Sequence, residues 1–203
     1  MNIIIGTNNE YKAGEMRWIL DQIGGVKVIP LKDTGIEINV EEDQSSLLGN
    51  AKKKARVISM HTDSYVLCSD GGMDIPGLGE KWDILRNQRI VGENNTDIVK
   101  VNKLIDLMRG LKDSERRAEY HFALALARNG KILWEDEEVT EKGIILEKLP
   151  SEDIPEYKWM GQVFYIKEFD KIHNNLTSEE REKFRVSGSK NLVDSLKVFI
   201  ETS

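Results

Sequence analysis

Thr7, Asn8 and Asn9 form a short polar stretch between an apolar run and a predicted helix. Lys12 lies about one turn into that helix. The first backbone N–H groups of a helix lack intrahelical partners and lie at the positive end of its dipole, so they bind anions such as phosphate. Thr7 and Asn9 add side-chain donors. The stretch predicts a phosphate-binding loop, and the alternative is a polar helix cap beside a solvated lysine.

A second group of polar side chains combines Glu42 with Asn50 and Lys54. Asn50 and Lys54 are four residues apart on a predicted helix, so they share one of its faces. Glu42 lies just before that helix. A functional role for this group is one interpretation, and the alternative is a lysine-rich helix face that is simply solvated.

A third candidate is Asp70, in the sequence CSDGGMD. It directly follows a predicted buried strand and precedes Gly71 and Gly72. Acidic residues at the carboxyl ends of sheet strands, beside glycines that let the chain turn, often form metal or ligand sites. The alternative is an ordinary Asp-Gly turn.

The elements that must position these residues follow from hydrophobic periodicity and from turn and cap residues. Asn129-Gly130 is a strong hairpin signal, and residues 72–92 show no sustained periodicity, which predicts a long loop with at most a short helical turn. Strand–helix alternation followed by a hairpin predicts an α/β protein with a mixed sheet. The predicted strands are 2–6, 26–31, 65–68, 117–128, 131–139, 143–147 and 163–166, and the predicted helices are 9–23, 45–61, 96–108 and a region from residue 177.

Composition limits the function classes. With 39% apolar and 32% charged residues, the chain is expected to be globular. It has no apolar segment near the roughly 20 residues that span a bilayer, so no membrane partner is expected. The single cysteine, Cys68, suits a reducing cytoplasm. The net charge of −6 argues against a duplex nucleic-acid partner, which requires a basic face.

Taken in order, the three groups of residues resemble the inosine triphosphate pyrophosphatase family, which hydrolyses deaminated purine nucleoside triphosphates. Five family motifs occur in sequence with similar spacing, from residue 2 to about residue 145. The family patterns T-G-N-x-x-K, E-N-A-x-x-K-A, D-D-S-G-L, N-x-K-L-L and R-x-A-x-F-x-C-x-L-A-L correspond to residues 7–12, 49–55, 69–73, 102–105 and 116–126, and a family glutamate corresponds to Glu42.

This resemblance implies a single two-lobed domain over residues 1–203, with a central mixed β-sheet flanked by helices and an active-site cleft between the lobes. It implies Mg²⁺-dependent hydrolysis of a ribo- or deoxyribonucleoside triphosphate to the monophosphate and pyrophosphate, with Mn²⁺ as a substitute metal. The implied role is house-cleaning of non-standard, deaminated purine nucleotides. Family members are commonly homodimers, so a cytoplasmic homodimer is expected by resemblance.

The resemblance also assigns roles to residues. Glu42 and Asp70 would hold the metal, and Asp70 would also orient the attacking water. Lys12 and Lys54 would neutralise the triphosphate. The predicted catalytic residues are therefore Asp70, Lys12 and Lys54, and the predicted phosphate-side contacts are Thr7, Asn8, Asn9, Lys12, Asn50, Lys54 and Gly71.

The chain departs from the family mainly where the base would bind. Ser69 replaces one of two adjacent acidic residues, and Gly161 stands where an aspartate is expected. The family's S-H-R motif is absent from the sequence around residues 185–190. Trp159 could stack on a base and Lys190 could donate to a base oxygen. The alternatives are a core tryptophan and a lysine on a solvated helix face.

Two other functions remain open from the sequence. One is the same chemistry on a different or broader set of nucleoside triphosphates, because the base-recognition motif is lost. The other is a nucleotide-binding protein with little catalysis, because one acidic residue is missing. The retained Lys12, Glu42, Lys54 and Asp70 argue against the second, since a decayed site would be expected to lose such charges.

Overall fold

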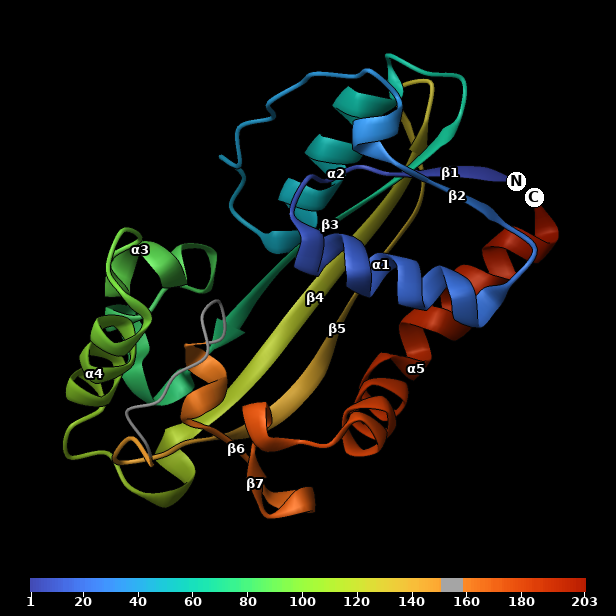
Figure 1. The fold of residues 1–203 in the computed structure, drawn as a ribbon. Helices are drawn as coiled ribbons and strands as arrows, with labels where there is room; N and C mark the ends of the chain where they lie inside the picture. Colours follow the sequence, from blue (N-terminus) through green and yellow to red (C-terminus); the bar gives the residue numbers. More distant parts are fainter. Residues whose placement is uncertain (151–158) are drawn as a thin grey trace. The chain divides into compact units, whose positions relative to one another are not determined.

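The computed structural model of the chain describes residues 1–150 and 159–203 (Figure 1). The strands are β1 (Asn2–Ile5), β2 (Lys27–Pro30), β3 (Tyr65–Asp74), β4 (Arg117–Arg128), β5 (Lys131–Ile145), β6 (Phe164–Ile166) and β7 (Lys171–Ile172). The α-helices are α1 (Glu10–Ile23), α2 (Leu47–Ser59), α3 (Asn87–Val91), α4 (Asp97–Leu107) and α5 (Ser178–Thr202). Short 3-10 helices occupy Leu31–Asp33, Pro76–Lys81, Ile84–Arg86, Asp113–Arg116, Met160–Gln162, Lys167–Phe169 and His173–Asn175.

The strands form one mixed sheet in the order β2-β1-β3-β4-β5-β6-β7. β1 runs parallel to β2 and β3, whereas β6 is antiparallel to β5 and β7. The predicted α/β fold with a mixed sheet and flanking helices is therefore confirmed. None of the helices in the described ranges is long and apolar enough to cross a membrane.

The chain divides into two compact units. The first consists of Met1–Gly71, Phe122–Glu138 and Ser189–Ser203, and the second of Gly72–His121 and Val139–Gly188. The single domain over residues 1–203 and the cleft between two lobes stay predictions.

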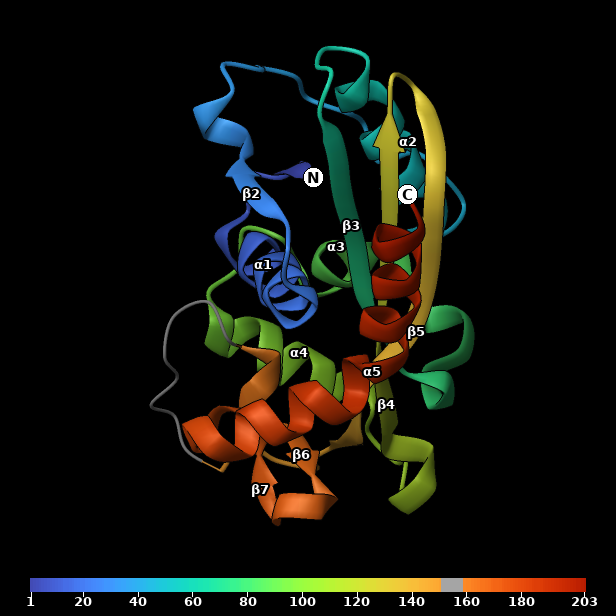
Figure 2. The same ribbon diagram turned by 90° about the vertical axis from the view of Figure 1, so that its right-hand side faces the viewer.

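In the first unit, apolar stripes on the helices cover the sheet. Figure 2 shows α1 and α2 on opposite sides of β3. Asn9 caps α1 by accepting a hydrogen bond from the backbone N–H of Lys12, and Ser46 caps α2 by accepting one from Gly49. The buried apolar residues of these elements include Ile3, Ile4 and Ile5 of β1, Met16, Ile19 and Leu20 of α1, and Leu47, Ala51, Ala55 and Ile58 of α2.

The predicted hairpin is confirmed. Asn129 has φ of 50° and Gly130 has φ of 73°. A two-residue hairpin turn of type I′ requires positive φ at both positions, which Asn-Gly adopts readily. β5 continues to Ile145, so the strand predicted at 143–147 is the far end of the same strand.

The prediction that β3 ends at Cys68 is wrong, because the strand runs on to Asp74. Asp70 therefore lies inside a strand, and the Asp-Gly turn considered as an alternative is also wrong. Neither Gly71 nor Gly72 has positive φ. The role of Gly72 is close approach, because a Cβ there would lie 2.3 Å from the backbone oxygen of Ile84. Pairing with β4 extends the strand through residues of low strand propensity.

The predicted loop at 72–92 is only partly correct, since it contains the end of β3, two 3-10 helices and α3. Its apolar side chains, among them Trp82 and Val91, join the hydrophobic core of the second unit. That core also contains Leu104 and Met108 near the end of α4, and Phe164 of β6. The buried side chains of this segment do not recur with a helical or strand period. Hydrophobic periodicity therefore did not predict its short helices.

The final helical region is a single helix, α5, of 25 residues. Thr177 and Glu180 have the sequence spacing of a capping box, and the structure forms one. Thr177 Oγ1 accepts from the Glu180 N–H at 3.2 Å, and the Glu180 carboxylate accepts from the Thr177 N–H at 2.8 Å. Within the second unit α5 passes β5 at Gly188, where a Cβ would lie 1.8 Å from the backbone oxygen of Thr140.

Two glycine-to-alanine changes are expected to have opposite effects on stability. Gly188→Ala should lower the free energy of unfolding by about 1–3 kcal/mol, because the added methyl group meets backbone that cannot move aside cheaply. Gly14→Ala in α1 should raise it by about 0.5–1 kcal/mol, because no atom lies within 4 Å of the new Cβ and alanine favours helix. Urea unfolding of both variants measures the signs, and a stabilised Gly188→Ala protein would show that α5 does not pass so close to β5.

Candidate functional site

Asp70 is the centre of the candidate site in the first unit. The residue is only 5% exposed. Its Oδ1 accepts hydrogen bonds from Lys12 Nζ at 2.8 Å and from the Gly71 N–H at 3.0 Å. Its Oδ2 accepts one from Asn50 Nδ2 at 3.0 Å. The structure therefore brings together side chains from all three predicted groups, from α1, α2 and β3.

The pairing of β1 with β3 explains how Lys12 reaches Asp70. The last paired residues are Ile5 and Leu67, and the Gly6 N–H donates to the Leu67 oxygen at 2.8 Å. There β1 ends and the chain turns into α1, while β3 continues for seven more residues. The side of β3 beyond Leu67 is thus not covered by β1, and the first turn of α1 brings the Lys12 side chain to it.

The charge state of Asp70 results from opposing effects. Burial acts to raise the pKa of its carboxyl group, but the charges of Lys12 and Lys54 and the hydrogen bonds from Lys12 and Asn50 outweigh it, so the pKa is lowered. The carboxylate therefore stays ionised at neutral pH. A buried ionised carboxylate is stable only where cations and donors surround it, as they do here.

Lys54 connects Asp70 to Glu42. Its Nζ lies 2.6 Å from Glu42 Oε1 and 3.8 Å from Asp70 Oδ1. Together with Lys12 these residues form a row of alternating charges, Glu42–Lys54–Asp70–Lys12, which we call the charge row. It brings together the four charged residues that the sequence selected, and a solvated helix face is excluded as an account of Lys54, whose side chain is only 13% exposed.

Asn50 is buried and holds two parts of the site together. Its Nδ2 donates to Asp70, and its Oδ1 accepts from the backbone N–H of Gln44 at 3.0 Å. Gln44 belongs to the segment that carries Glu42. The sequence selected Asn50 but not Gln44, because nothing in a side-chain pattern indicates a backbone N–H as a partner.

The polar stretch after β1 uses its side chains as caps. Thr7 Oγ1 accepts from the Asn9 N–H, and Asn9 Oδ1 accepts from the Lys12 N–H, both at 3.1 Å. Asn8 and Asn9 are exposed. The capping alternative thus accounts for these two hydrogen bonds, and phosphate contacts by Thr7, Asn8 and Asn9 stay predictions.

The two residues predicted to read the base are placed as their alternatives stated. Trp159 is 5% exposed and belongs to the hydrophobic core of the second unit. Lys190 forms an ion pair with Asp194, one turn further along α5, and 69% of its side chain is exposed. The environments match the alternatives of a core tryptophan and a lysine on a solvated helix face. Base contacts by Trp159 and Lys190 stay predictions.

Glu42 and Asp70 offer the chemistry that a hard divalent cation requires. Mg²⁺ is usually held by one or two carboxylates together with water and phosphate oxygens. Both carboxylates contact the same lysine, and 45% of the Glu42 side chain is exposed. The described residues contain no cluster of three or more His, Cys, Asp or Glu side chains that could hold a metal. The donor set therefore fits a cation that is shared with a phosphate ligand rather than one enclosed by protein.

Cys68 precedes the site by two residues but is expected to be inert. It is fully buried, its Sγ lies 3.5 Å from the Gly6 oxygen, and burial raises the pKa of its thiol to about 12. The thiolate is the reactive form.

A thiol reagent at mildly alkaline pH should therefore leave Cys68 of the folded protein unmodified and label the denatured protein fully. Rapid labelling of folded protein, measured by mass, would contradict this burial.

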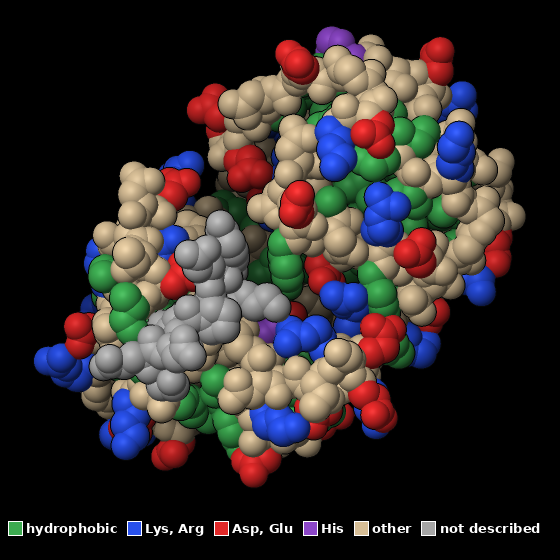
Figure 3. All heavy atoms as spheres, viewed as in Figure 1, with side chains coloured by type: hydrophobic (Ala, Val, Ile, Leu, Met, Phe, Trp, Pro, Cys, Tyr) green, Lys and Arg blue, Asp and Glu red, His purple; other side chains and the backbone are tan. Residues whose placement is uncertain are grey.

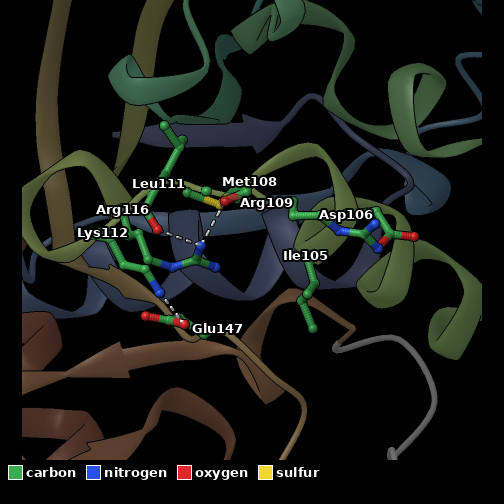
Figure 4. A pocket seen from close by; sticks show the side chains of 9 residues that line it. Ile105, Asp106, Met108, Arg109, Leu111, Lys112, Arg116 and Glu147 are labelled. Carbon is green, nitrogen blue, oxygen red and sulfur yellow. Dashed lines mark hydrogen bonds and ion pairs between the residues drawn. The ribbon is translucent and has the colours of Figure 1, made fainter.

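The second unit contains a cavity of about 330 Å³ beside the end of α4 (Figure 4). Arg116 lies against it, and its guanidinium donates to backbone oxygens that include those of Met108 and Leu111. The lining charges pair with one another, Lys112 with Glu147 and Arg109 with Asp106. None of the predicted site residues lines this cavity, and its buried cation is already bound by backbone carbonyls.

Two lysines beside the start of a helix in an α/β fold supply cations and backbone donors that can bind phosphate. Comparison with known proteins agrees, since residues 3–190 match the family model described as Ham1 family. The chain belongs to the Ham1 family.

Sequence relatives of the chain are named as enzymes. It is 35% identical over 127 residues to a dITP/XTP pyrophosphatase of Clostridium tetani. The aligned region covers 61% of this chain and 61% of that enzyme. It is 28% identical over 204 residues to a dITP/XTP pyrophosphatase of Clostridium perfringens, and this aligned region covers 96% of each protein. The predicted kinship with nucleoside triphosphate pyrophosphatases is therefore confirmed.

A solved structure shows the same fold. The HAM1 protein from Coxiella burnetii is similar with a TM-score of 0.80 and 22% identity, over the full length of both chains. At this identity the similarity concerns the fold alone.

Proposed function

We propose that the chain is a divalent-metal-dependent nucleoside triphosphate pyrophosphatase that converts a nucleoside triphosphate to the monophosphate and pyrophosphate, in the house-cleaning of non-standard purine nucleotides. The observation that carries the proposal is the charge row, in a chain whose relatives are named dITP/XTP pyrophosphatases. Mg²⁺ is the proposed metal and Glu42 and Asp70 its proposed ligands, with Mn²⁺ as a substitute.

The chemistry requires positioning and charge stabilisation. Water attacks the α-phosphorus, and the bond from this phosphorus to the oxygen that bridges the α- and β-phosphates breaks. The bridging oxygen leaves as part of pyrophosphate, and the attacking water loses a proton to solvent. Extra negative charge develops on the phosphate oxygens, and preorganised cations stabilise it. Lys12 and Lys54 supply two such cations as compact point charges. A bound Mg²⁺ would add Lewis-acid stabilisation of the same oxygens.

Asp70 is proposed to orient the attacking water. Because its pKa is lowered, its carboxylate is ionised and able to accept a hydrogen bond from water. Asn50 and the Gly71 N–H fix the direction of the carboxylate. Such positioning converts a collision of two partners into a reaction of aligned groups, which is a large part of enzymatic rate enhancement.

Nucleic acid is not a proposed partner. The net charge is −6, and Figure 3 shows Lys and Arg side chains interspersed with Asp and Glu over the face in view. A duplex-binding protein needs cations gathered on one surface. A homodimer and a cytoplasmic location are proposed from the family resemblance.

A second candidate keeps the reaction but broadens the substrate. The placement of Trp159 in the core and of Lys190 in an ion pair favours it, because both base contacts proposed from the sequence are otherwise engaged. A site that lacks a buried donor for the base discriminates weakly between bases.

The test is steady-state kinetics with Mg²⁺ and a panel of inosine, xanthosine, guanosine, adenosine and pyrimidine triphosphates, with pyrophosphate release as the readout. Turnover of any of them supports the pyrophosphatase. A preference of about a hundredfold or more for inosine or xanthosine over guanosine triphosphate would favour the house-cleaning role over the broad alternative. Binding without turnover of any nucleotide would leave a nucleotide-binding protein.

A further inference from the structure

In the charge row, each group that a metal–phosphate complex would need is already bound by a group of opposite sign. Lys12 Nζ lies 2.8 Å from Asp70 Oδ1, and Lys54 Nζ lies 2.6 Å from Glu42 Oε1. Two ammonium groups and two carboxylates thereby neutralise one another.

Three of the four side chains of the charge row are largely buried, which makes an unpaired charge on them costly. The side chain of Asp70 is 7% exposed, that of Lys54 is 13% exposed and that of Lys12 is 21% exposed. Removing one partner of such a pair leaves a charge without compensation in a medium that screens poorly. The Glu42 side chain is 45% exposed, so this cost falls on Asp70, Lys12 and Lys54. A cation at Asp70 or an anion at Lys12 or Lys54 that arrives alone therefore competes with an existing ion pair.

A metal ion without phosphate would compete with Lys12 and Lys54 for the carboxylate oxygens. A polyphosphate without metal would compete with Asp70 and Glu42 for the lysines, and would lie close to both carboxylates. When both arrive, the carboxylates contact the metal and the lysines contact phosphate, so that every charge again has a partner. The flexible four-carbon stems of the lysines permit this exchange without movement of the helices.

We infer that Lys12 and Lys54 act as internal counter-ions that make the site select a metal-bound polyphosphate over free metal and over free polyphosphate. The inference rests on the proposed function and deepens it by naming the form of the substrate. Its distinctive consequence is that deleting a carboxylate strengthens binding of a metal-free anion, and that deleting a lysine strengthens binding of a bare metal.

The chain supplies a matched control. Lys53 and Asp43 form an ion pair at 2.7 Å, each adjacent in sequence to its counterpart in the Lys54–Glu42 pair. No contact joins Lys53 or Asp43 to Asp70 among the ion pairs of the described residues. Lys53→Met and Asp43→Asn therefore remove a nearby charge without opening the charge row.

The first arm uses inorganic tripolyphosphate with EDTA, measured by calorimetry on the whole chain. Asp70→Asn is expected to bind it at least about fivefold more tightly than the unmodified protein. In Asp43→Asn, the fold-change in tripolyphosphate affinity should be less than half of that in Asp70→Asn. Equal or weaker binding by Asp70→Asn would overturn the inference, and circular dichroism melting shows that each variant is folded.

The second arm uses Mn²⁺ alone, followed through the paramagnetic resonance signal of the free ion. Lys12→Met is expected to bind Mn²⁺ at least about fivefold more tightly, and Lys53→Met much less so. An unchanged or weakened Mn²⁺ affinity in Lys12→Met would also overturn the inference.

Pyrophosphate release from the nucleotide panel, measured on the unmodified protein of the same preparation, separates the two proposals. Turnover without these affinity changes would overturn the counter-ion inference and leave the pyrophosphatase standing. The affinity changes without turnover of any nucleotide would overturn the pyrophosphatase and support the exchange of partners in the charge row.

Discussion

Asp70→Asn is expected to lower kcat/KM for nucleoside triphosphate hydrolysis by about 10²- to 10³-fold. Asparagine keeps the shape of the side chain, and its oxygen can still accept from Lys12 and Gly71. It removes the negative charge that would hold a divalent metal and orient water. The measurement is pyrophosphate release at saturating Mg²⁺, together with a thermal melt that verifies folding.

Glu42→Gln is expected to lower activity in the same direction, because Glu42 is the other carboxylate of the charge row. Asp43→Asn is the control, since it removes the next carboxylate along the chain, which pairs with Lys53. Near-normal turnover by both Asp70→Asn and Glu42→Gln would place the metal site elsewhere. If Asp43→Asn lowers activity as much as Asp70→Asn and Glu42→Gln do, the effect is a general consequence of removing a negative charge.

Arg116→Met is expected to lower the free energy of unfolding by about 3–5 kcal/mol, the largest effect on stability that we predict. Arg116 is 4% exposed, and its guanidinium donates to the backbone oxygens of Met108 and Leu111 (Figure 4). It also donates to the backbone oxygens of Ile145 and Leu146. It joins the end of α4 to the end of β5. Methionine fills much of the volume but leaves these oxygens without a charged donor, and buried unpaired carbonyls are costly. Urea unfolding measures the loss.

The neighbouring arginine provides the comparison. Arg117 is exposed and lies 3.7 Å from Glu119, so Arg117→Met should change stability by less than about 0.5 kcal/mol. Arg116→Lys should lie between the two, because a lysine cannot supply the fork of N–H groups. Equal stabilities of Arg116→Met and Arg117→Met would show that the guanidinium is dispensable to the second unit.

The sequence predicted those parts of the fold where local preference and tertiary structure agree. The three isoleucines of β1, the caps of α1 and α5, and the Asn129-Gly130 turn are of this kind. The sequence failed at β3, where a polar and glycine-containing segment suggested a turn. Pairing with β4 overrides that local preference, and no pattern within the segment itself encodes its neighbour.

The candidate site could be predicted in part for a related reason. Lys12, Glu42, Lys54 and Asp70 stood out because their order and spacing matched a family, and the structure brings them together. Their mutual pairing could not be predicted, since it depends on where β1 stops pairing with β3. Trp159 and Lys190 were chosen because they lie in the segments that depart from the family's base-recognition motifs. Position and residue type together do not separate a base contact from a core tryptophan or a solvated lysine.

The neutrality of the charge row has a consequence for the rate at which ligand arrives. Two positive and two negative charges set a few ångströms apart produce a field that largely cancels beyond their immediate surroundings, and the whole chain carries −6. A basic cleft draws anions from a distance and loses that advantage as salt screens it. Here there is little long-range attraction to screen. A polyphosphate therefore gains no steering from the charge row, and added salt should not slow its association, because salt screens only the repulsion from the net negative charge of the chain.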